Sequence, residues 1–340
     1  MEKIPLNYVP LPEPVPITEQ VWPEGTRPLV CTRTMAYMHE KFIRQCIEGI
    51  LMQRTTFPVR VVIHDDASTD ATPDIIREYE AKYPQLIKVV YQSENTHAKP
   101  DRMERRAEVR KLGKEGRYHA FCEGDDYWTD PEKLHDQVAL LEREPGLSGC
   151  FTDAWNETDG EREPFYPSLL GTAREAGGTD LEGLLADNIV PTATLLVRSE
   201  RMFPIPVQVI TAPAGDWILL VHLAKQGRLG FIDRKTAVRR RHAGGMISMK
   251  GREDRTAMTV GCLQHIRTMV DAKYHKRIAD RITELRRSTL EEFIAADDQP
   301  AALRIWSTFK GQGFSLREQL RYRALLFAPR LMRTYHRLRT

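Results

Sequence analysis

The sequence contains no stretch of about 20 apolar residues, the length that a membrane-spanning helix needs. Its first 20 residues, MEKIPLNYVPLPEPVPITEQ, also lack the apolar core of a secretory signal. Cysteine is scarce: five residues, an odd number, are scattered along the chain without CxxC spacing. This pattern argues against a disulfide framework or a zinc knuckle and favours a reducing compartment. We therefore expect a cytoplasmic protein.

A large excess of one charge is absent as well. The 340 residues include 50 Lys and Arg against 47 Asp and Glu, a formal net charge of +3, which gives no reason to expect a nucleic-acid partner. Hydrophobic residues make up 41% and charged residues 29%, a balance typical of globular proteins. The basic charge is concentrated in residues 314–340, where seven Arg and one Glu give a local net of +6, so the other 313 residues net −3.

Strands alternate with helices along the first half of the chain. We predict strands at 29–35, 59–64, 86–91 and 117–122, and helices at 40–53, 72–82, 101–113 and 131–142. This alternation indicates an α/β fold with a mainly parallel, mixed sheet flanked by helices. Further on we expect short strands at 193–197 and 229–232 and a helix from Asp216 to residue 227, and beyond residue 252 the pattern is helical.

Three parts of the chain follow from this pattern. Seven prolines within residues 1–28 favour an extended arm at 1–27, which either packs passively on the rest of the chain or stays mobile. We expect an α/β domain at 28–250, divided near residue 145, and a helical C-terminal region at 251–340.

Two acidic clusters directly follow predicted strands. The segment HDDASTD, residues 64–70, comes after VRVVI, and EGDD, residues 123–126, comes after YHAFC. Ligands of open α/β sheets bind beyond the carboxyl ends of the strands. Adjacent carboxylates repel one another unless a cation or hydrogen-bond donors compensate, and Mg²⁺ or Mn²⁺ carrying a substrate diphosphate would do so. We favour ligand contact for Asp66 and Asp126, whereas Ser68 and Asp70 are as readily explained as caps of the next helix.

Several motifs in order resemble the family 2 glycosyltransferases, which have the GT-A fold. They are PLV with YMHEKFIRQCIEGILMQ, HDDASTDATPDIIREYEAKYP, CEGDDYWTDPEKLHDQVALLE, and AGDWILLVHLAKQGRLGFID leading to VRRRHAGGMIS, together covering about 220 of the 340 residues. The resemblance implies a GT-A-type α/β domain whose residues 28–145 bind a nucleotide sugar and whose residues 146–250 bind the acceptor.

The resemblance also implies roles in the nucleotide-sugar half. Asp66 matches the carboxylate that accepts a hydrogen bond from the imide N–H of uracil. Because a carboxylate only accepts, the base would be uracil, thymine or guanine, with a UDP-sugar favoured over a CMP-sugar. Tyr37 and Asp125 match nucleotide contacts, and Asp126 matches the direct ligand of a Mn²⁺ or Mg²⁺ ion that bridges the two phosphates.

The acceptor half carries the other implied roles. Asp216 matches the general base that takes the proton from the acceptor hydroxyl in an inverting single displacement. Without the resemblance, capping of a helix would be the preferred role for Asp216. His242 matches a further metal ligand and Arg240 a diphosphate contact, both on a loop that closes over the diphosphate. The alternative for this run is a solvated basic loop.

The sequence departs from the family pattern at several positions. The first strand usually ends in Thr-Tyr-Asn, but here Ala36 and Met38 flank Tyr37. The usual Arg-Asn pair before the Asp-Asp site falls near Ala107-Glu108, and Arg239 replaces the usual tyrosine. The leading hypothesis is a metal-dependent inverting glycosyltransferase of surface polysaccharide or glycoconjugate synthesis. Alternatives are a sugar-nucleotide-binding protein with weakened activity and a nucleotidyltransferase on a related fold.

The C-terminal segment FSLREQLRYRALLFAPRLMRTYHRLRT mixes arginine with apolar residues, which is typical of basic amphipathic helices. It suits contact with the anionic inner face of the plasma membrane, as an enzyme with a lipid-linked acceptor would need. Packing on the body of the protein or on a partner subunit, as in a homo-oligomer, explains the segment equally well, and Pro329 interrupts it. The acceptor is a glycan, a lipid-linked group or another hydroxyl compound.

Overall fold

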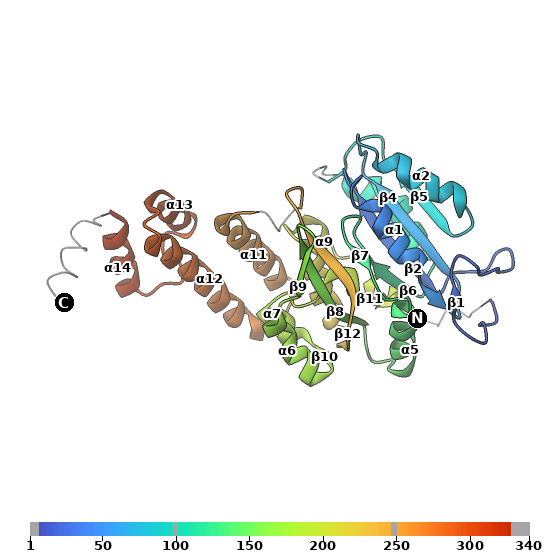
Figure 1. Ribbon diagram of the computed structural model, residues 1–340. Helices are drawn as coiled ribbons and strands as arrows, with labels where there is room; N and C mark the ends of the chain where they lie inside the picture. The colour runs from blue at the N-terminus through green and yellow to red at the C-terminus, as the bar shows by residue number, and fades with distance from the viewer. Residues whose placement is uncertain (1–6, 98, 100, 246–249, 328–340) are drawn as a thin grey trace. The chain divides into compact units, whose positions relative to one another are not determined.

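The structure is a computed structural model that describes residues 7–97, 99, 101–245 and 250–327 (Figure 1). The chain forms two compact units. The first contains the chain up to Ile210 together with Leu219–Ala243, and the second contains Thr211–Ile218 and the chain from Gly244 onward. The expected boundaries at residues 27, 145 and 250 stay predictions.

A ten-stranded mixed sheet forms the centre of the first unit, in the order β10-β12-β8-β11-β6-β2-β4-β5, with β7 paired to β12 and β9 to β8. β2 runs parallel to both β4 and β6, and β4 runs parallel to β5. β11 is antiparallel to β6 and β8, which joins this group to the parallel pair of β8 and β12. The predicted mixed α/β sheet is therefore confirmed. The strand bounds are β2 Val30–Ala36, β4 Val59–Asp65, β5 Ile87–Tyr91, β6 Tyr118–Phe121, β7 Tyr127–Trp128, β8 Gly149–Thr158, β9 Glu161–Pro164, β10 Gly178–Thr179, β11 Leu196–Arg198 and β12 Leu229–Arg241.

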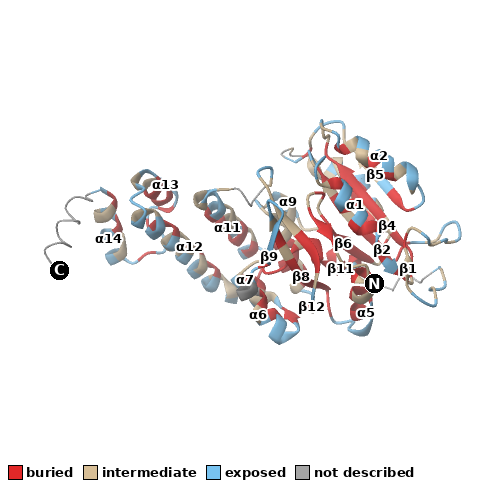
Figure 2. Ribbon diagram, viewed as in Figure 1, coloured by how far each residue is buried: buried red, intermediate tan, exposed pale blue. Residues whose placement is uncertain are grey.

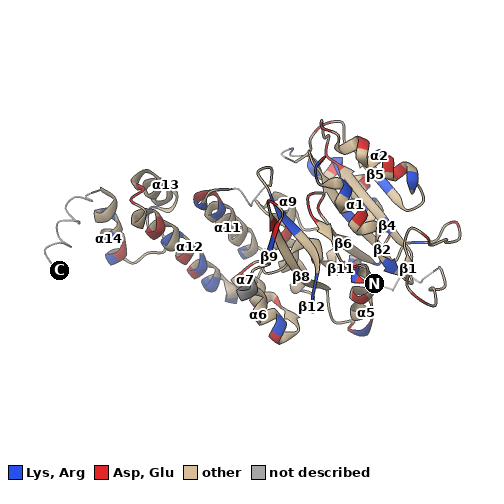
Figure 3. Cartoon of the chain, in the orientation of Figure 1, with Lys and Arg blue, Asp and Glu red and all other residues tan. Residues whose placement is uncertain are grey.

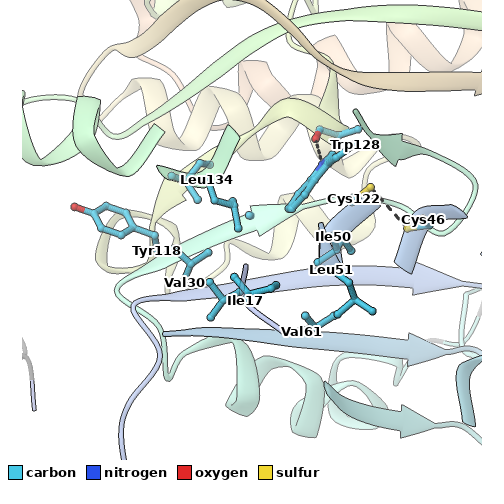
Figure 4. Close-up of a cluster of buried hydrophobic side chains, with 14 of the residues drawn as sticks. Ile17, Val30, Cys46, Ile50, Leu51, Val61, Tyr118, Cys122, Trp128 and Leu134 are labelled. Carbon is cyan, nitrogen blue, oxygen red and sulfur yellow. Dashed lines mark hydrogen bonds between the residues drawn. The ribbon is translucent and has the colours of Figure 1, made fainter. Parts of the chain in front are cut away.

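Apolar residues at strand and helix periods build the core of this unit. β4 reads VRVVIHD and is buried along almost its whole length, as the red strand in Figure 2 shows. α1 (Ile43–Leu51) contributes Ile47 and Ile50 to this core. Figure 4 shows Ile50 among the buried side chains. Gly49 permits a very close approach, because a Cβ atom there would lie 2.7 Å from the backbone oxygen of Trp128. α1 therefore packs directly on β7, the strand that follows Asp125 and Asp126.

Most helix predictions in the first half are confirmed, with shifted ends. α2 (Thr72–Lys82) and α5 (Lys133–Arg143) occupy the predicted regions, whereas α1 begins three residues later than expected. The predicted helix at 101–113 is wrong as a single element. It is divided into α3 (Arg102–Arg105) and α4 (Ala107–Gly113), because the backbone leaves helical geometry at Arg106, whose side chain contacts Asp66 directly after β4.

Two strand predictions in the second half need correction. The strand expected at 229–232 continues as β12 to Arg241, because β12 pairs with β8 on one side and with β7 on the other. Arg240 therefore lies on a strand, not on the expected loop, and His242 follows directly. The strand expected at 193–197 begins only at Leu196, after a 3₁₀ turn at Thr192–Thr194. The remaining short helices of this half are α6 (Pro167–Ala176), α7 (Leu181–Ala186), α8 (Ser199–Met202), α9 (Val207–Thr211) and α10 (Gly215–Ala224).

The described part of the proline-rich arm packs on the first unit. Its β1 (Val15–Pro16) pairs with β3 (Arg54–Thr55), and Ile17 is buried in the main core. Tyr8 and Trp22 make an edge-to-face ring contact with centroids 5.2 Å apart. The arm is extended, as the proline content predicts, and it packs on the unit through backbone pairing and apolar contact.

The second unit contains four longer helices: α11 (Arg252–Arg267), α12 (His275–Ala295), α13 (Gln299–Phe309) and α14 (Leu316–Phe327). A separate aromatic core around Trp306, Phe309 and Phe314 holds α12, α13 and α14 together. The helical prediction beyond residue 252 is confirmed for the described residues, and the tail at 328–340, with Pro329, lies outside them. Among the described residues, no helix has the length and apolar character to cross a membrane.

Candidate functional site

The polar residues after β4 hold the loop that carries Tyr37. Three successive backbone N–H groups of the β2–α1 loop are bound by side chains of residues 65–72. Ser68 Oγ accepts from Met38 N at 3.0 Å, Thr72 Oγ1 from His39 N at 2.8 Å, and Asp70 Oδ2 from Glu40 N at 3.1 Å. Asp70 also accepts from Thr72 N, the first residue of α2, whereas the N-cap residue of that helix is Ala71 and makes no side-chain cap. Tyr37 itself is 48% exposed.

Asp66 directly follows β4 and is buried in a network of hydrogen bonds. Its Oδ1 accepts from both the backbone N and the hydroxyl of Thr96, at 2.9 and 2.6 Å. Its Oδ2 pairs with Arg106 Nη2 at 3.1 Å, and Arg106 Nε donates to Thr96 Oγ1 at 2.8 Å. The carboxylate that we expect to bind the base is therefore held by two residues that lie 30 and 40 positions further along the chain.

Asp125 and Asp126 lie between β6 and β7 and contact the end of β12. Asp126 is 8% exposed, and its Oδ1 accepts from the backbone N–H of Arg240 at 2.9 Å. Burial, and then the neighbouring charge of Asp125, raise the pKa of Asp126 well above its usual value. The Oδ2 atom of Asp125 lies 3.1 Å from His242 Nε2. The structure thus brings together Asp125, Asp126, Arg240 and His242 at one edge of the sheet.

The Arg240 side chain is engaged with the protein and is only 9% exposed. Its Nη1 donates to the backbone oxygen of Asp125 at 2.8 Å, and its Nε pairs with Glu157 Oε1 at 3.3 Å. Its guanidinium lies 4.2 Å from the ring centroid of Tyr127 and also contacts the Gln45 side chain. Arg240 is therefore not part of a solvated basic loop.

Asp216 lies in the first turn of α10. Residues Thr211–Ile218 belong to the second unit, whereas Asp66, Asp125, Asp126, Arg240 and His242 all belong to the first. The general-base role of Asp216 therefore stays a prediction. Within its own unit, Cys262 Sγ contacts the backbone oxygen of Ala214 at 3.6 Å, two residues before Asp216.

The donor types at the Asp-Asp site suit a hard divalent cation. Asp125, Asp126 and His242 offer carboxylate oxygens and an imidazole nitrogen, and a cation would offset the charge of two adjacent carboxylates. In the described part of the chain, no group of three or more His, Cys, Asp or Glu side chains is already arranged around a single metal position. The residues fit such an ion by chemistry, with Asp126 and His242 as the expected ligands.

Sequence reasoning missed Thr96, Arg106, Gln45 and Glu157. Arg106 lies one residue before the place where the family's Arg-Asn pair was expected, so a signal for it was present. No comparable signal marks Thr96, which reaches Asp66 from the loop after β5. Trp128 and Trp217, which lie close to Asp126 and Asp216 in the sequence, are buried, at 1% and 5% exposure.

Comparison with known proteins finds a family similarity for the central part of the chain. Residues 34–196 match the model of "Glycosyl transferase family 2". An uncharacterized protein of Mycobacterium tuberculosis is 38% identical over 215 residues, 63% of this chain and 59% of the relative. The chain thus spans 59% of the length of that relative.

Solved structures show the same fold at low identity. Residues 1–349 of TarS from S. aureus, in complex with UDP-GlcNAc, align with a TM-score of 0.57 at 17% identity, covering 82% of this chain and 80% of that one. The mannosyltransferase PcManGT from Pyrobaculum calidifontis, in complex with GDP-Man and Mn²⁺, aligns with a TM-score of 0.55 at 18% identity, covering 99% and 86%. The solved structures thus show that the chain has a GT-A-type fold, and residues 34–196 are similar to glycosyl transferase family 2.

Proposed function

We propose that this chain is a metal-dependent inverting glycosyltransferase that moves a sugar from a nucleoside diphosphate sugar, with a UDP-sugar favoured, to an acceptor hydroxyl. The observation that carries the proposal is the cluster of Asp125, Asp126, Arg240 and His242 at the sheet edge. Asp66 follows β4 at the carboxyl end of a parallel strand, as the Asp125-Asp126 pair follows β6, and such strand ends are where this kind of sheet binds ligands.

The chemistry assigns a task to each residue. A Mn²⁺ or Mg²⁺ ion held by Asp126 and His242 would supply positive charge at the diphosphate. The Asp216 carboxylate takes the proton from the acceptor hydroxyl as that oxygen bonds to the anomeric carbon. The bond between this carbon and the diphosphate oxygen breaks, the nucleoside diphosphate leaves, and the configuration of the carbon is inverted.

The test is nucleotide release from UDP-, dTDP- and GDP-sugars with Mn²⁺, and then with a chelator. We expect release from one donor class to need the metal and to fall at least about 100-fold in Asp126→Asn. Asp216→Asn should lower turnover about 10²- to 10⁴-fold while nucleotide affinity stays unchanged. Asp74→Asn is the matched control, because Asp74 is an exposed carboxylate in the first turn of α2.

The same measurement separates the alternatives. Full release in Asp126→Asn or with chelator would refute metal dependence. Binding without any release, even after candidate acceptors are supplied, would favour the sugar-nucleotide-binding protein with weakened activity, for which Ala36, Met38 and Arg239 are the sequence argument. Nucleotide transfer to a sugar phosphate would favour a nucleotidyltransferase.

The proposal places the enzyme in surface polysaccharide or glycoconjugate synthesis, in the cytoplasm at the inner face of the plasma membrane. Five buried, unpaired cysteines support a reducing compartment. The acceptor is a glycan or lipid-linked hydroxyl compound, and the C-terminal helices are the proposed contact with the membrane. A homo-oligomer formed through these helices stays a prediction.

The exposed face of α14 supports the membrane contact. Leu316, Leu320 and Phe327 are 74%, 59% and 67% exposed, and their spacing of four and seven residues places them in one stripe of the helix. Tyr322 and Leu326, on the opposite face, are buried in the aromatic core of this unit. α14 therefore has a second apolar face that the described residues leave uncovered.

The charge on α14 complements an anionic surface (Figure 3). Arg317, Arg321 and Arg323 are all exposed. Glu318, the one acidic residue within α14, pairs with Arg287 of α12 at 2.7 Å and also accepts from Ser315. An apolar stripe flanked by arginines is the composition of a helix that lies in the headgroup region of an anionic membrane. A second copy of the chain is the competing occupant, which a measurement of oligomeric state would reveal.

A further inference from the structure

The hydrogen bonds around Asp66 leave its two carboxylate oxygens unequal. Each oxygen of a carboxylate can accept about two hydrogen bonds. Oδ1 accepts two from Thr96, one from the backbone N at 2.9 Å and one from the hydroxyl at 2.6 Å. Oδ2 accepts one, from Arg106 Nη2 at 3.1 Å. Within the described part of the chain, Oδ1 is therefore filled and Oδ2 keeps one acceptor position.

Arg106 adds donors beside that acceptor position. A guanidinium carries five N–H donors. Two of these are accounted for, by Asp66 Oδ2 and by Thr96 Oγ1, and no acceptor for the other three is found among the described residues. The Arg106 side chain is 21% exposed, against 6% for Asp66, so the cluster opens toward solvent on the Arg106 side. Next to Arg106, the cluster thus offers one unfilled acceptor position, on Oδ2, beside several donors.

The cluster is also rigid. Thr96 is fully buried, and its hydroxyl both donates to Asp66 and accepts from Arg106 Nε, which closes a ring of hydrogen bonds among the three side chains. The Asn95 side chain donates to the backbone oxygen of Asp66 at 3.4 Å, and Gln92 N donates to the backbone oxygen of Asp65 at 2.9 Å. These bonds hold the loop after β5. Turning the Asp66 carboxylate to release Oδ1 would break its three hydrogen bonds, two with Thr96 and one with Arg106.

The three bases with a ring N–H present different edges to such a cluster. Uracil and thymine offer a single imide N–H between two carbonyl oxygens. Guanine offers its ring N–H beside an exocyclic amino group, and this pair of donors requires both oxygens of a carboxylate. With Oδ1 filled by Thr96, the guanine amino group would be left without an acceptor, which is costly in a desolvated site.

We infer that Thr96 and Arg106 make Asp66 selective for the imide edge of uracil or thymine and select against guanine. The inference rests on the proposed function, since it takes Asp66 as the residue that meets the base. It narrows the donor to a UDP- or dTDP-sugar. The comparisons leave this choice open, because one structural neighbour is a complex with UDP-GlcNAc and another a complex with GDP-Man.

The experiment is equilibrium binding of UDP, dTDP and GDP to the full chain with Mn²⁺, by calorimetry. We expect UDP and dTDP to bind at least about ten-fold more tightly than GDP. Thr96→Val keeps the backbone N–H and the side-chain shape but removes the hydroxyl, so Oδ1 regains an acceptor position and the ratio of UDP to GDP affinity should fall several-fold. Thr268→Val, a change at an exposed threonine of the second unit, is the control and should leave the ratio unchanged.

The outcomes separate this inference from the proposed function. GDP binding as tight as UDP binding in the unmodified protein would overturn the inference and leave a glycosyltransferase in place. Failure of all three nucleotides to bind would overturn the proposed function itself. Thr96→Ser retains the hydroxyl and the N–H, so it should preserve the ratio. If Thr96→Ser lowers the ratio as much as Thr96→Val, the hydroxyl does not set selectivity. The ratio in the unmodified protein tests the inference even if a variant does not fold.

Discussion

Acid should destabilise the first unit through His119, a histidine in the middle of β6. Its side chain is 3% exposed, and its ring contacts the rings of Phe121 and Phe203 at centroid distances of 5.0 and 6.1 Å. Burial, followed by the positive charge of Arg33, lowers the pKa of His119 from 6.5 to about 3. At pH 7 the imidazole is therefore neutral in the folded protein.

The sign and size of the effect follow from proton linkage. Between pH 6.5 and about 3 the unfolded chain binds a proton at this histidine and the folded chain does not, so stability falls as the pH is lowered. From pH 7 to pH 5 the loss from one such group is about 2 kcal/mol. Any folded pKa below about 4 gives nearly the same loss at pH 5, because the pKa of the unfolded chain then sets it.

The assay compares urea unfolding of the unmodified protein and of His119→Leu at pH 7 and pH 5. Other groups also titrate between pH 7 and pH 5. The loss in the free energy of unfolding over this range is therefore measured for each protein, and the two losses are compared. We expect the unmodified protein to lose about 2 kcal/mol more than His119→Leu. Val9→Ser, a change at an exposed position without a titratable group, should behave like the unmodified protein. Equal losses in the unmodified protein and His119→Leu would refute the argument that His119 stays neutral when folded.

Two further predictions concern packing and the membrane. Gly49→Ala should lower the free energy of unfolding by about 1–3 kcal/mol in thermal or urea denaturation, because the new methyl group would lie 2.7 Å from the Trp128 backbone oxygen; unchanged stability would show that α1 can move away from β7 at little cost. Replacing the three exposed apolar residues of α14 by serine should weaken co-sedimentation with anionic phosphatidylglycerol vesicles at least about ten-fold, whereas Val9→Ser/Val21→Ser, at exposed apolar positions of the arm, should not. Membrane contact would be contradicted if all these proteins co-sedimented equally. It would also be contradicted if the α14 variant changed its oligomeric state and not its co-sedimentation.

The sequence was sufficient for the alternating part of the fold because the signals there are local. β4 and α1 each carry a run or a stripe of apolar residues that specifies the element. β12 was predicted only in part, because its second half, KTAVRRR, looks like a polar surface segment. It forms a strand because it pairs with β8 and β7, two strands that lie far from it in the sequence. Stacking of the Arg240 guanidinium on Tyr127 allows the charge to lie there, and no local pattern announces it.

The candidate site was likewise predicted only in part. The positions of Asp66 and Asp126 after predicted strands follow from local sequence, and the structure places both there. Thr96 and Arg106 contact Asp66 across 30 and 40 residues, and Arg106 does so from a break between two helices that the charged pattern predicted as one. Contacts of that range depend on tertiary structure, which is why sequence reasoning assigned Asp66 a ligand but not its protein partners.

The acidic residues at the sheet edge do not depend on a bound cation alone for compensation. Asp70 accepts from the backbone N–H of Glu40, Asp126 from that of Arg240, and Asp66 from that of Thr96. Each carboxylate thus uses part of its acceptor capacity to fix a backbone segment from elsewhere in the chain, and the bound N–H groups offset some of the repulsion between neighbouring charges. The remaining acceptor positions are the ones that a ligand can use. A change of Asp66 or Asp126 to alanine would therefore remove a backbone anchor together with the ligand contact. Asparagine keeps an acceptor oxygen for the backbone N–H, so the asparagine variants are the ones that isolate the chemistry.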